Sequence, residues 1–294
     1  KKGVVGKPSI SYTGNFTYTS RPRYSDSDVY MMNSAERTDV SQELIDRKMY
    51  YNNVTQWSGY EQAVQDYYSG KLNYSEFKDK ADYYRSVNTD WLGLLTHDSF
   101  SHNHTVSLSG GSPNIKYYAS LGYGEENGVI KQEKNERYSS MLNLTATYRK
   151  FNAQFQLQAN SSKRNYAPQQ LGVMDYAYNT SRAMPAYNPD GSLFYYPRPN
   201  TTGQIYNFNI LNEIANSGDG SETNGVNMHA QIRYDILSCL NIDALLAYNI
   251  SNTTREQYYT KDTYYVYGLR ADQSARNDQC PVGGELTRQD TKND

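Results

Sequence analysis

The segment 152–160, NAQFQLQAN, alternates strictly between amide and apolar side chains. A period of two places successive side chains on opposite faces of a β-strand, so this strand has one apolar and one amide-rich face. The solvent-facing side of a soluble sheet usually carries Lys and Glu, whereas this segment contains neither. The amide-rich face therefore indicates a shared aqueous interior rather than bulk solvent.

The same alternation recurs along the chain and predicts strands at residues 9–18, 104–109, 116–123, 141–148, 152–160, 226–235 and 242–250. Most of these segments approach the roughly 9–11 residues that a tilted strand needs to cross a bilayer. The predicted fold class is all-β: an antiparallel transmembrane β-barrel segment, with about seven strands of a larger barrel.

The connections between these strands alternate between short and long. The short ones are residues 110–114, 149–151 and 237–240, and the long ones are 19–103, 124–137, 161–225 and 251 onward. In outer-membrane barrels the short turns lie on the periplasmic side and the long loops lie outside. The alternation therefore assigns a side to every connection, and a soluble sandwich has no reason to show it.

Tyrosine is abundant, with 31 residues against 7 of phenylalanine. Tyrosines lie at the ends of several predicted strands: Tyr18, Tyr123, Tyr138, Tyr148, Tyr234 and Tyr248. An amphipathic ring at the lipid headgroup level satisfies both its apolar body and its hydroxyl, which is how aromatic girdles form. The alternative is that tyrosine is simply a favourable strand residue.

Average composition resembles that of a soluble protein, with a mean hydropathy of −0.86 and 37% hydrophobic residues. A barrel gives such values because only every second strand residue meets lipid and long polar loops dilute the average. The net charge of −2 provides no basic patch, so no nucleic-acid partner is expected.

Seven strands cannot enclose an aqueous interior, because even eight-stranded barrels are filled by their own side chains. The sequence starts at Lys1 without an initiator Met or signal peptide and stops in the polar stretch 288–294. Unpaired sheet edges are not viable in lipid. We therefore expect strands outside this sequence to complete the barrel.

Several segments resemble, in order, those of the SusC/RagA-type TonB-dependent transporters. They are KKGVVGKPSISY at 1–12, MNSAER at 32–37, NTDWL at 88–92, HNHTVSLSGG at 102–111, YYASLGY at 117–123, ERY at 136–138 and YNPDGS at 187–192. The resemblance extends to about residue 270 and leaves residues 271–294 unplaced.

This resemblance implies an outer-membrane importer of a Bacteroidetes-type bacterium, with a plugged barrel of roughly 22 strands. Its implied partners are a SusD-like surface lipoprotein lid, outer-membrane lipid, and a TonB complex that acts through N-terminal parts absent here. The implied substrate is an oligosaccharide or peptide fragment. Residues 1–8 would be the plug-to-barrel junction, 9–18 the first strand, 19–103 a long extracellular loop with helices, 104–250 strands two to seven, and 251–294 a truncated extracellular loop.

The first long loop contains three pairs with the spacing of a helix N-cap and its third residue: Asn33 with Glu36, Ser58 with Glu61, and Asn73 with Glu76. The simpler interpretation is a helical subdomain over the barrel mouth. The alternative is a docking surface for the lipoprotein lid, with Trp57, Tyr60 and Trp91 as candidate contacts.

The loop 161–225 concentrates aromatic residues among prolines, and the candidate ligand-binding residues are Tyr176, Tyr178, Tyr187, Tyr195 and Tyr196. Aromatic faces on stiff loops suit stacking against sugar rings or peptide side chains. The alternative is that these rings pack against one another where the strands provide no core.

Catalytic and metal-binding signals are weak, and we expect no enzyme activity, cofactor or metal. His97, His102 and His104 lie near one another without ligands at metal spacing, and turn chemistry explains Asp26, Asp28 and Asp190. Cys239 and Cys280 are predicted to lie on opposite sides of the membrane and to be unpaired. Two alternatives remain open: a soluble or surface-exposed glycan-binding or adhesion module, and a structural barrel that transports nothing.

Overall fold

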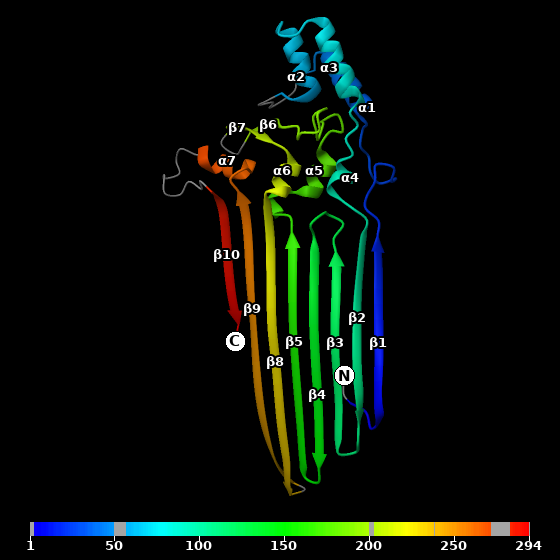
Figure 1. The fold of residues 1–294 in the computed structure, drawn as a ribbon, viewed down its shortest axis with the longest axis vertical. Helices are drawn as coiled ribbons and strands as arrows, with labels where there is room; N and C mark the ends of the chain where they lie inside the picture. The colour runs from blue at the N-terminus through cyan, green and yellow to red at the C-terminus, as the bar shows by residue number, and fades with distance from the viewer. Residues whose placement is uncertain (1–2, 50–56, 200–202, 238, 272–282, 294) are drawn as a thin grey trace.

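The computed structural model describes residues 3–49, 57–199, 203–237, 239–271 and 283–293. Its main feature is an 8-stranded antiparallel sheet in the order β1-β2-β3-β4-β5-β8-β9-β10 (Figure 1). The strands are β1 Gly6–Thr19, β2 Ser99–Gly111, β3 Ile115–Asn127, β4 Lys134–Tyr148, β5 Phe151–Tyr166, β8 Ser217–Leu237, β9 Leu240–Thr260 and β10 Gly284–Asn293. The short turns β2–β3, β4–β5 and β8–β9 lie at one end of the sheet, and the helices lie at the other.

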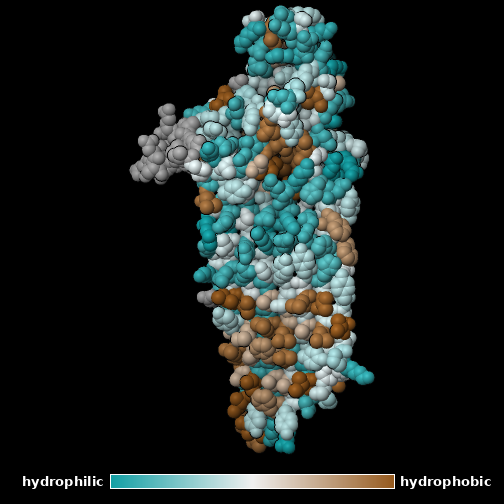
Figure 2. Space-filling view, in the orientation of Figure 1, coloured by the Kyte–Doolittle hydropathy of each residue, from teal (hydrophilic) through white to brown (hydrophobic). Residues whose placement is uncertain are grey.

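The strand register joins the apolar positions into one continuous face. Leu142 lies opposite Leu157, which lies opposite Met228 on the next strand. Among the described residues, no second layer of sheet or helix packs against this face, and Leu121 on β3 leaves 69% of its surface exposed. Figure 2 shows apolar side chains gathered in a band across the turn-side half of the strands, with polar residues above. The predicted all-β segment is therefore confirmed.

Aromatic residues mark both ends of this apolar face. Tyr148, Phe151 and Tyr234 are neighbours across three strands near the turns, and Tyr123 pairs with Tyr138 toward the loops. From Tyr138 to Tyr148 the strand rises about 33 Å, which a tilt of about 40° reduces to about 25 Å. This height matches the apolar band of an outer-membrane barrel.

The strands are longer than the alternation predicts. The prediction of an extracellular loop from residue 251 onward was wrong in part. β9 continues to Thr260, and β10 pairs with it through residues 284–293. The Arg288 guanidinium lies 3.3 Å from the Glu256 carboxylate, and Thr254 donates to Asp290 at 2.6 Å. Both faces of this region are polar, so no period of two marks it in the sequence.

Three helices form a pack at the far end of the loops: α1 Ser34–Asp46, α2 Gly59–Tyr68 and α3 Tyr74–Ser86. Asn33 and Asn73 each form a complete capping box with the glutamate three residues later. Ser58 precedes α2 but makes no side-chain cap. Its expected partner Glu61 instead lies 2.8 Å from Arg37 and so joins α2 to α1.

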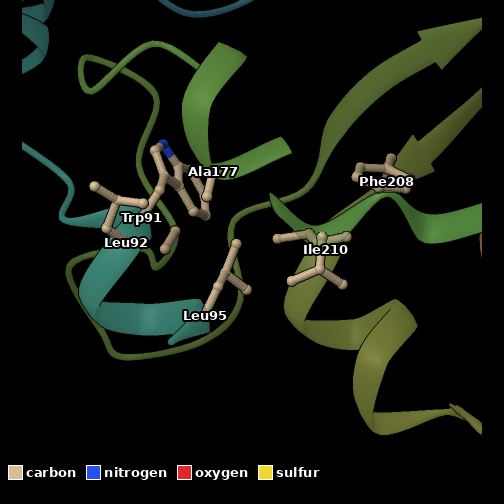
Figure 3. Packing of buried hydrophobic residues seen from close by; sticks show 8 residues of the cluster. Trp91, Leu92, Leu95, Ala177, Phe208 and Ile210 are labelled. Atoms are coloured by element: carbon tan, nitrogen blue, oxygen red, sulfur yellow. The ribbon is translucent and has the colours of Figure 1, made fainter. Parts of the chain in front are cut away.

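Short elements between the helical pack and the sheet form what we call the cap: α4 Trp91–Leu95, η1 Gln169–Leu171, α5 Val173–Asn179, β6 Tyr196–Pro199, β7 Ile205–Phe208, α6 Ile210–Ala215 and α7 Tyr264–Ala271. Its core contains Trp91, Leu92, Leu95, Ala177 and Ile210 (Figure 3). The cluster joins two connections that are distant in sequence, because α4 lies between β1 and β2 whereas α5 and α6 lie between β5 and β8. No helix in the described ranges is both long and apolar enough to cross a membrane.

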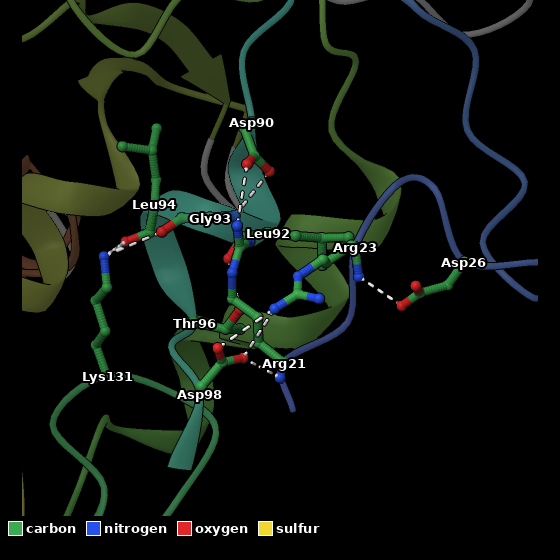
Figure 4. A network of polar contacts seen from close by, with 10 residues as sticks. All are labelled: Arg21, Arg23, Asp26, Asp90, Leu92, Gly93, Leu94, Thr96, Asp98 and Lys131. Carbon is green, nitrogen blue, oxygen red and sulfur yellow. Dashed lines mark hydrogen bonds and ion pairs between the residues drawn. The ribbon is translucent and has the colours of Figure 1, made fainter. Parts of the chain in front are cut away.

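A polar network fastens the cap to the tops of β1 and β2 (Figure 4). The Asp98 carboxylate accepts the backbone N–H of Arg21 at 2.8 Å and lies 3.3 Å from the Arg23 guanidinium. Asp90 accepts the Gly93 N–H at 2.8 Å and so caps α4, while Lys131 donates to the carbonyl of Leu94 at 2.7 Å. α4 is therefore held at both ends.

Candidate ligand-binding site

A pocket of about 660 Å³ opens in the cap beside β7, α6 and α7. Its lining is Tyr195, Ile205, Tyr206, Asn207, Asn212, Asp262 and Tyr267. This volume lies within the range of sites that hold small ligands. Tyr195 and Tyr267 leave 43% and 45% of their surfaces exposed, so ring area remains available to a ligand.

Asn212 organises the polar side of the pocket. Its side-chain oxygen accepts the Tyr195 hydroxyl at 3.1 Å, and its side-chain nitrogen donates to the Asp262 carbonyl at 2.8 Å. Burial raises the pKa of Tyr195, and the negative charges of Glu213 and Asp262 act in the same direction. The hydroxyl therefore stays neutral and can both donate and accept. Tyrosine rings beside amide and carboxylate groups can stack on a ring and bond its hydroxyls.

The five aromatic residues predicted as ligand contacts occupy different environments. Tyr195 lines the pocket, whereas Tyr178 and Tyr187 are exposed elsewhere on the loop. Tyr176 and Tyr196 lie in the cap, where their hydroxyls are 3.2 Å apart and the Tyr176 ring packs 5.2 Å from that of Trp91. Burial raises the pKa of both hydroxyls. These two residues pack within the cap and do not line the pocket.

The candidate docking residues are mostly covered within this chain. Trp91 is 1% exposed and donates its indole N–H to the Ser181 carbonyl at 3.1 Å. Tyr60 is 7% exposed and donates to Gln42 at 2.8 Å, and Trp57 is half-buried. The helical pack instead exposes Tyr68 and Tyr74, at 68% and 66%.

The sequence reasoning missed Tyr206, Asn212, Asp262 and Tyr267. Two of them lie in the region beyond residue 251, which was expected to be loop. The run TYYVY at 263–267 is the signal that could have identified this wall of the pocket.

The structure also places His102, His104 and one of the two cysteines. His102 and His104 lie 5.1 Å apart, ring to ring, and His104 hydrogen-bonds the Tyr12 hydroxyl at 2.7 Å. Within the described ranges no group of three or more His, Cys, Asp or Glu residues could hold a metal. Cys239 is an exposed free thiol in the β8–β9 turn, and Cys280 lies outside the described residues.

Comparison with curated proteins finds similarity over part of the chain. The TonB-dependent receptor SusC of Bacteroides thetaiotaomicron is 32% identical over 84 residues, which are 28% of this chain and 8% of that receptor. The TonB-dependent receptor P26 of Formosa agariphila is 34% identical over 108 residues, which are 36% of this chain and 10% of the receptor. No protein-family model matches.

Among solved structures, the RagAB peptide transporter is 20% identical with a TM-score of 0.63, and the RagAB peptide importer in its closed-closed state is 18% identical with a TM-score of 0.62. Each match covers 90% of this chain and 30% of the other. At such identity the likeness is one of fold. Together these similarities confirm the resemblance to SusC/RagA-type TonB-dependent transporters, at partial coverage.

Proposed function

We propose that this chain is a part of a SusC-type TonB-dependent nutrient importer in a bacterial outer membrane, contributing barrel wall and extracellular cap. The exposed apolar face, bounded by aromatic residues and about 25 Å high, is the observation that carries this proposal. The similarity to two TonB-dependent receptors and to the RagAB fold supports it. The chain spans at most 30% of the matched proteins, so uptake is a property of a longer assembly.

The cap and the helical pack lie at the loop end, which the proposal places outside the cell. We assign the cap pocket to binding of an oligosaccharide or peptide fragment, with Tyr195, Tyr206 and Tyr267 as stacking surfaces. A SusD-like surface lipoprotein would cover this end and contact the exposed rings of Tyr68 and Tyr74. A TonB complex would supply energy from the opposite side, through parts of the importer outside this sequence.

The alternative of a soluble adhesion module conflicts with the apolar face. Leu121, Ile10 and Leu246 leave 69%, 76% and 59% of their surfaces exposed on this face. A contiguous apolar surface of this kind promotes association in water, whereas lipid covers it without cost. The relatives are named as receptors and importers, and no catalytic role is proposed for this chain.

The experiment compares two adjacent β5 residues in the full-length importer. Leu157 lies on the apolar face and Gln156 on the amide-rich face. Leu157→Arg should destabilise the barrel by about 2–4 kcal/mol and Gln156→Arg by much less, because only the first places a charge in lipid. Folding into lipid vesicles, followed by denaturant titration, measures both. Equal losses for the two variants would overturn the membrane assignment of this strand.

A further inference from the structure

Two hollows adjoin on the apolar side of the sheet. The lower one, about 680 Å³, lies within the loop-side part of the apolar face, and the upper one, about 610 Å³, lies toward the cap. Asn224 and Asn252 line both hollows and are cross-strand neighbours. The two hollows therefore form one trough, which we call the wall trough, with the asparagine pair at its middle.

Side-chain size creates the lower hollow. Across four strands the register places Leu121, Ser140, Ala159 and Val226 in one row, so two small residues lie between two large ones. Ser140 and Ala159 form the floor of the hollow, and the apolar side chains of Leu121 and Val226 form its walls. A linear hydrocarbon chain fits such a depression, because it gains contact on both sides.

The upper hollow has a different chemistry. Gly220 lies at its floor, and Asn165 and Tyr258 add polar groups. Its charged side chains have neighbours of opposite charge: Arg288 lies 3.3 Å from Glu256, and Lys163 is the register neighbour of Glu222. The third acidic residue of the lining, Asp219, pairs with Arg255 at 2.5 Å. A balanced lining of amides and a phenol suits uncharged hydroxyl groups better than a lone phosphate, which would need uncompensated cations.

We propose that the wall trough binds one glycolipid of the outer leaflet, a site that rests on the proposed membrane location. An acyl chain lies over Ser140 and Ala159, and the sugar headgroup lies between the Asn224–Asn252 pair and Tyr258. The change from apolar to polar lining coincides with the end of the apolar face at Tyr138.

The test is native mass spectrometry of the full-length importer, extracted from outer membranes in mild detergent. Wild type should retain one glycolipid, and Ala159→Phe should lower its occupancy roughly tenfold, because the ring displaces methylenes of the acyl chain. Ala153→Phe is the matched control, because Ala153 lies on the same strand and face but outside the trough. Ser140→Leu fills the floor from β4 and repeats the test if Ala159→Phe does not fold.

The outcomes separate this site from the proposed function. A wild-type protein that does not fractionate with outer membranes contradicts the membrane proposal itself. A folded outer-membrane barrel that retains no glycolipid, retains a phospholipid instead, or loses equal amounts in Ala159→Phe and Ala153→Phe overturns the wall trough while leaving the importer proposal intact.

Discussion

Tyr195 and Tyr267 line the cap pocket and are both partly exposed, and a hydrogen bond to Asn212 orients the Tyr195 ring. We expect Tyr195→Ala or Tyr267→Ala in the full-length importer to weaken binding by about 0.5–1.5 kcal/mol each, since each removes one stacking surface. Titration against libraries of neutral oligosaccharides and short peptides measures the change. Tyr187→Ala, an exposed tyrosine outside the pocket, is the control. Unchanged affinity in both pocket variants would remove the pocket from consideration.

We expect Glu213 to make the stability of the cap depend on pH. It is 1% exposed, and its carboxylate accepts the Tyr264 N–H at 2.8 Å. Burial raises the pKa of Glu213, and hydrogen bonds from Tyr264 and Asn212 offset this only in part. The folded state therefore binds the Glu213 proton more tightly than the unfolded state does. Protonation of Glu213 stabilises the fold fully at pH values below the ordinary carboxyl pKa, and this stabilisation is lost as the pH rises through the raised pKa of the folded state.

Glu213→Gln keeps a hydrogen-bond acceptor and removes the buried charge. We expect this variant to protect α7 better than wild type at neutral pH and to flatten the pH dependence of that protection. Hydrogen exchange of α7 amides between about pH 5 and 8, corrected for intrinsic rates, measures both effects. Glu222→Gln, at an exposed carboxylate on the outer wall, should match wild type. If protection of the α7 amides in the wild type rose with pH, the raised pKa of Glu213 would be contradicted.

At the level of elements, α2 and α3 provide a matched pair of helix starts. The Asn73 side chain accepts the Glu76 N–H at 3.0 Å, whereas the Ser58 side chain makes no cap bond. Asn73→Ala should therefore destabilise the helical pack by about 1 kcal/mol, and Ser58→Ala should have little effect. Limited proteolysis of the full-length protein reports the difference as faster cleavage within residues 57–86. Similar cleavage rates in both variants would argue against the α3 capping box.

The same elements show what the sequence could predict. Capping is local, so the spacing of Asn33 with Glu36 identified a helix start without knowledge of the fold. The spacing of Ser58 with Glu61 also identified a helix start, because Ser58 directly precedes α2. It did not reveal that Ser58 makes no side-chain cap bond or that Glu61 pairs with Arg37 on another helix. The strands were predicted where one face is apolar, and they were missed where both faces are polar, as in β10.

The cap pocket depends on still longer-range contacts. Tyr195 could be singled out from its own loop, but its neighbours Asn212 and Tyr267 come from α6 and α7. Whether a loop tyrosine is buried, as Tyr176 is, or lines a pocket depends on which other loop packs on it. Composition and spacing carry no information on that choice.

For the whole molecule, labelling of Cys239 tests which connections lie on the periplasmic side of the membrane and which lie outside. Cys239 is exposed in the β8–β9 turn, at the end opposite the helices. A membrane-impermeant thiol reagent should leave Cys239 unmodified in intact cells and label it after the outer membrane is permeabilised, because the bilayer separates the two ends. Cys280 is predicted to react without permeabilisation. Site-specific mass spectrometry reads both positions, and labelling of Cys239 in intact cells would reverse the topology.

The length of β9 determines how far the cap lies from the apolar face. From Asn252, level with the upper tyrosines, the strand continues about eight residues to Thr260, a further rise of about 20 Å after tilt. In the proposed membrane orientation, this part of the wall would hold the cap clear of the headgroup layer. Antibodies and phages should reach epitopes on the cap and helical pack, while the lipid and its sugars shield the wall below.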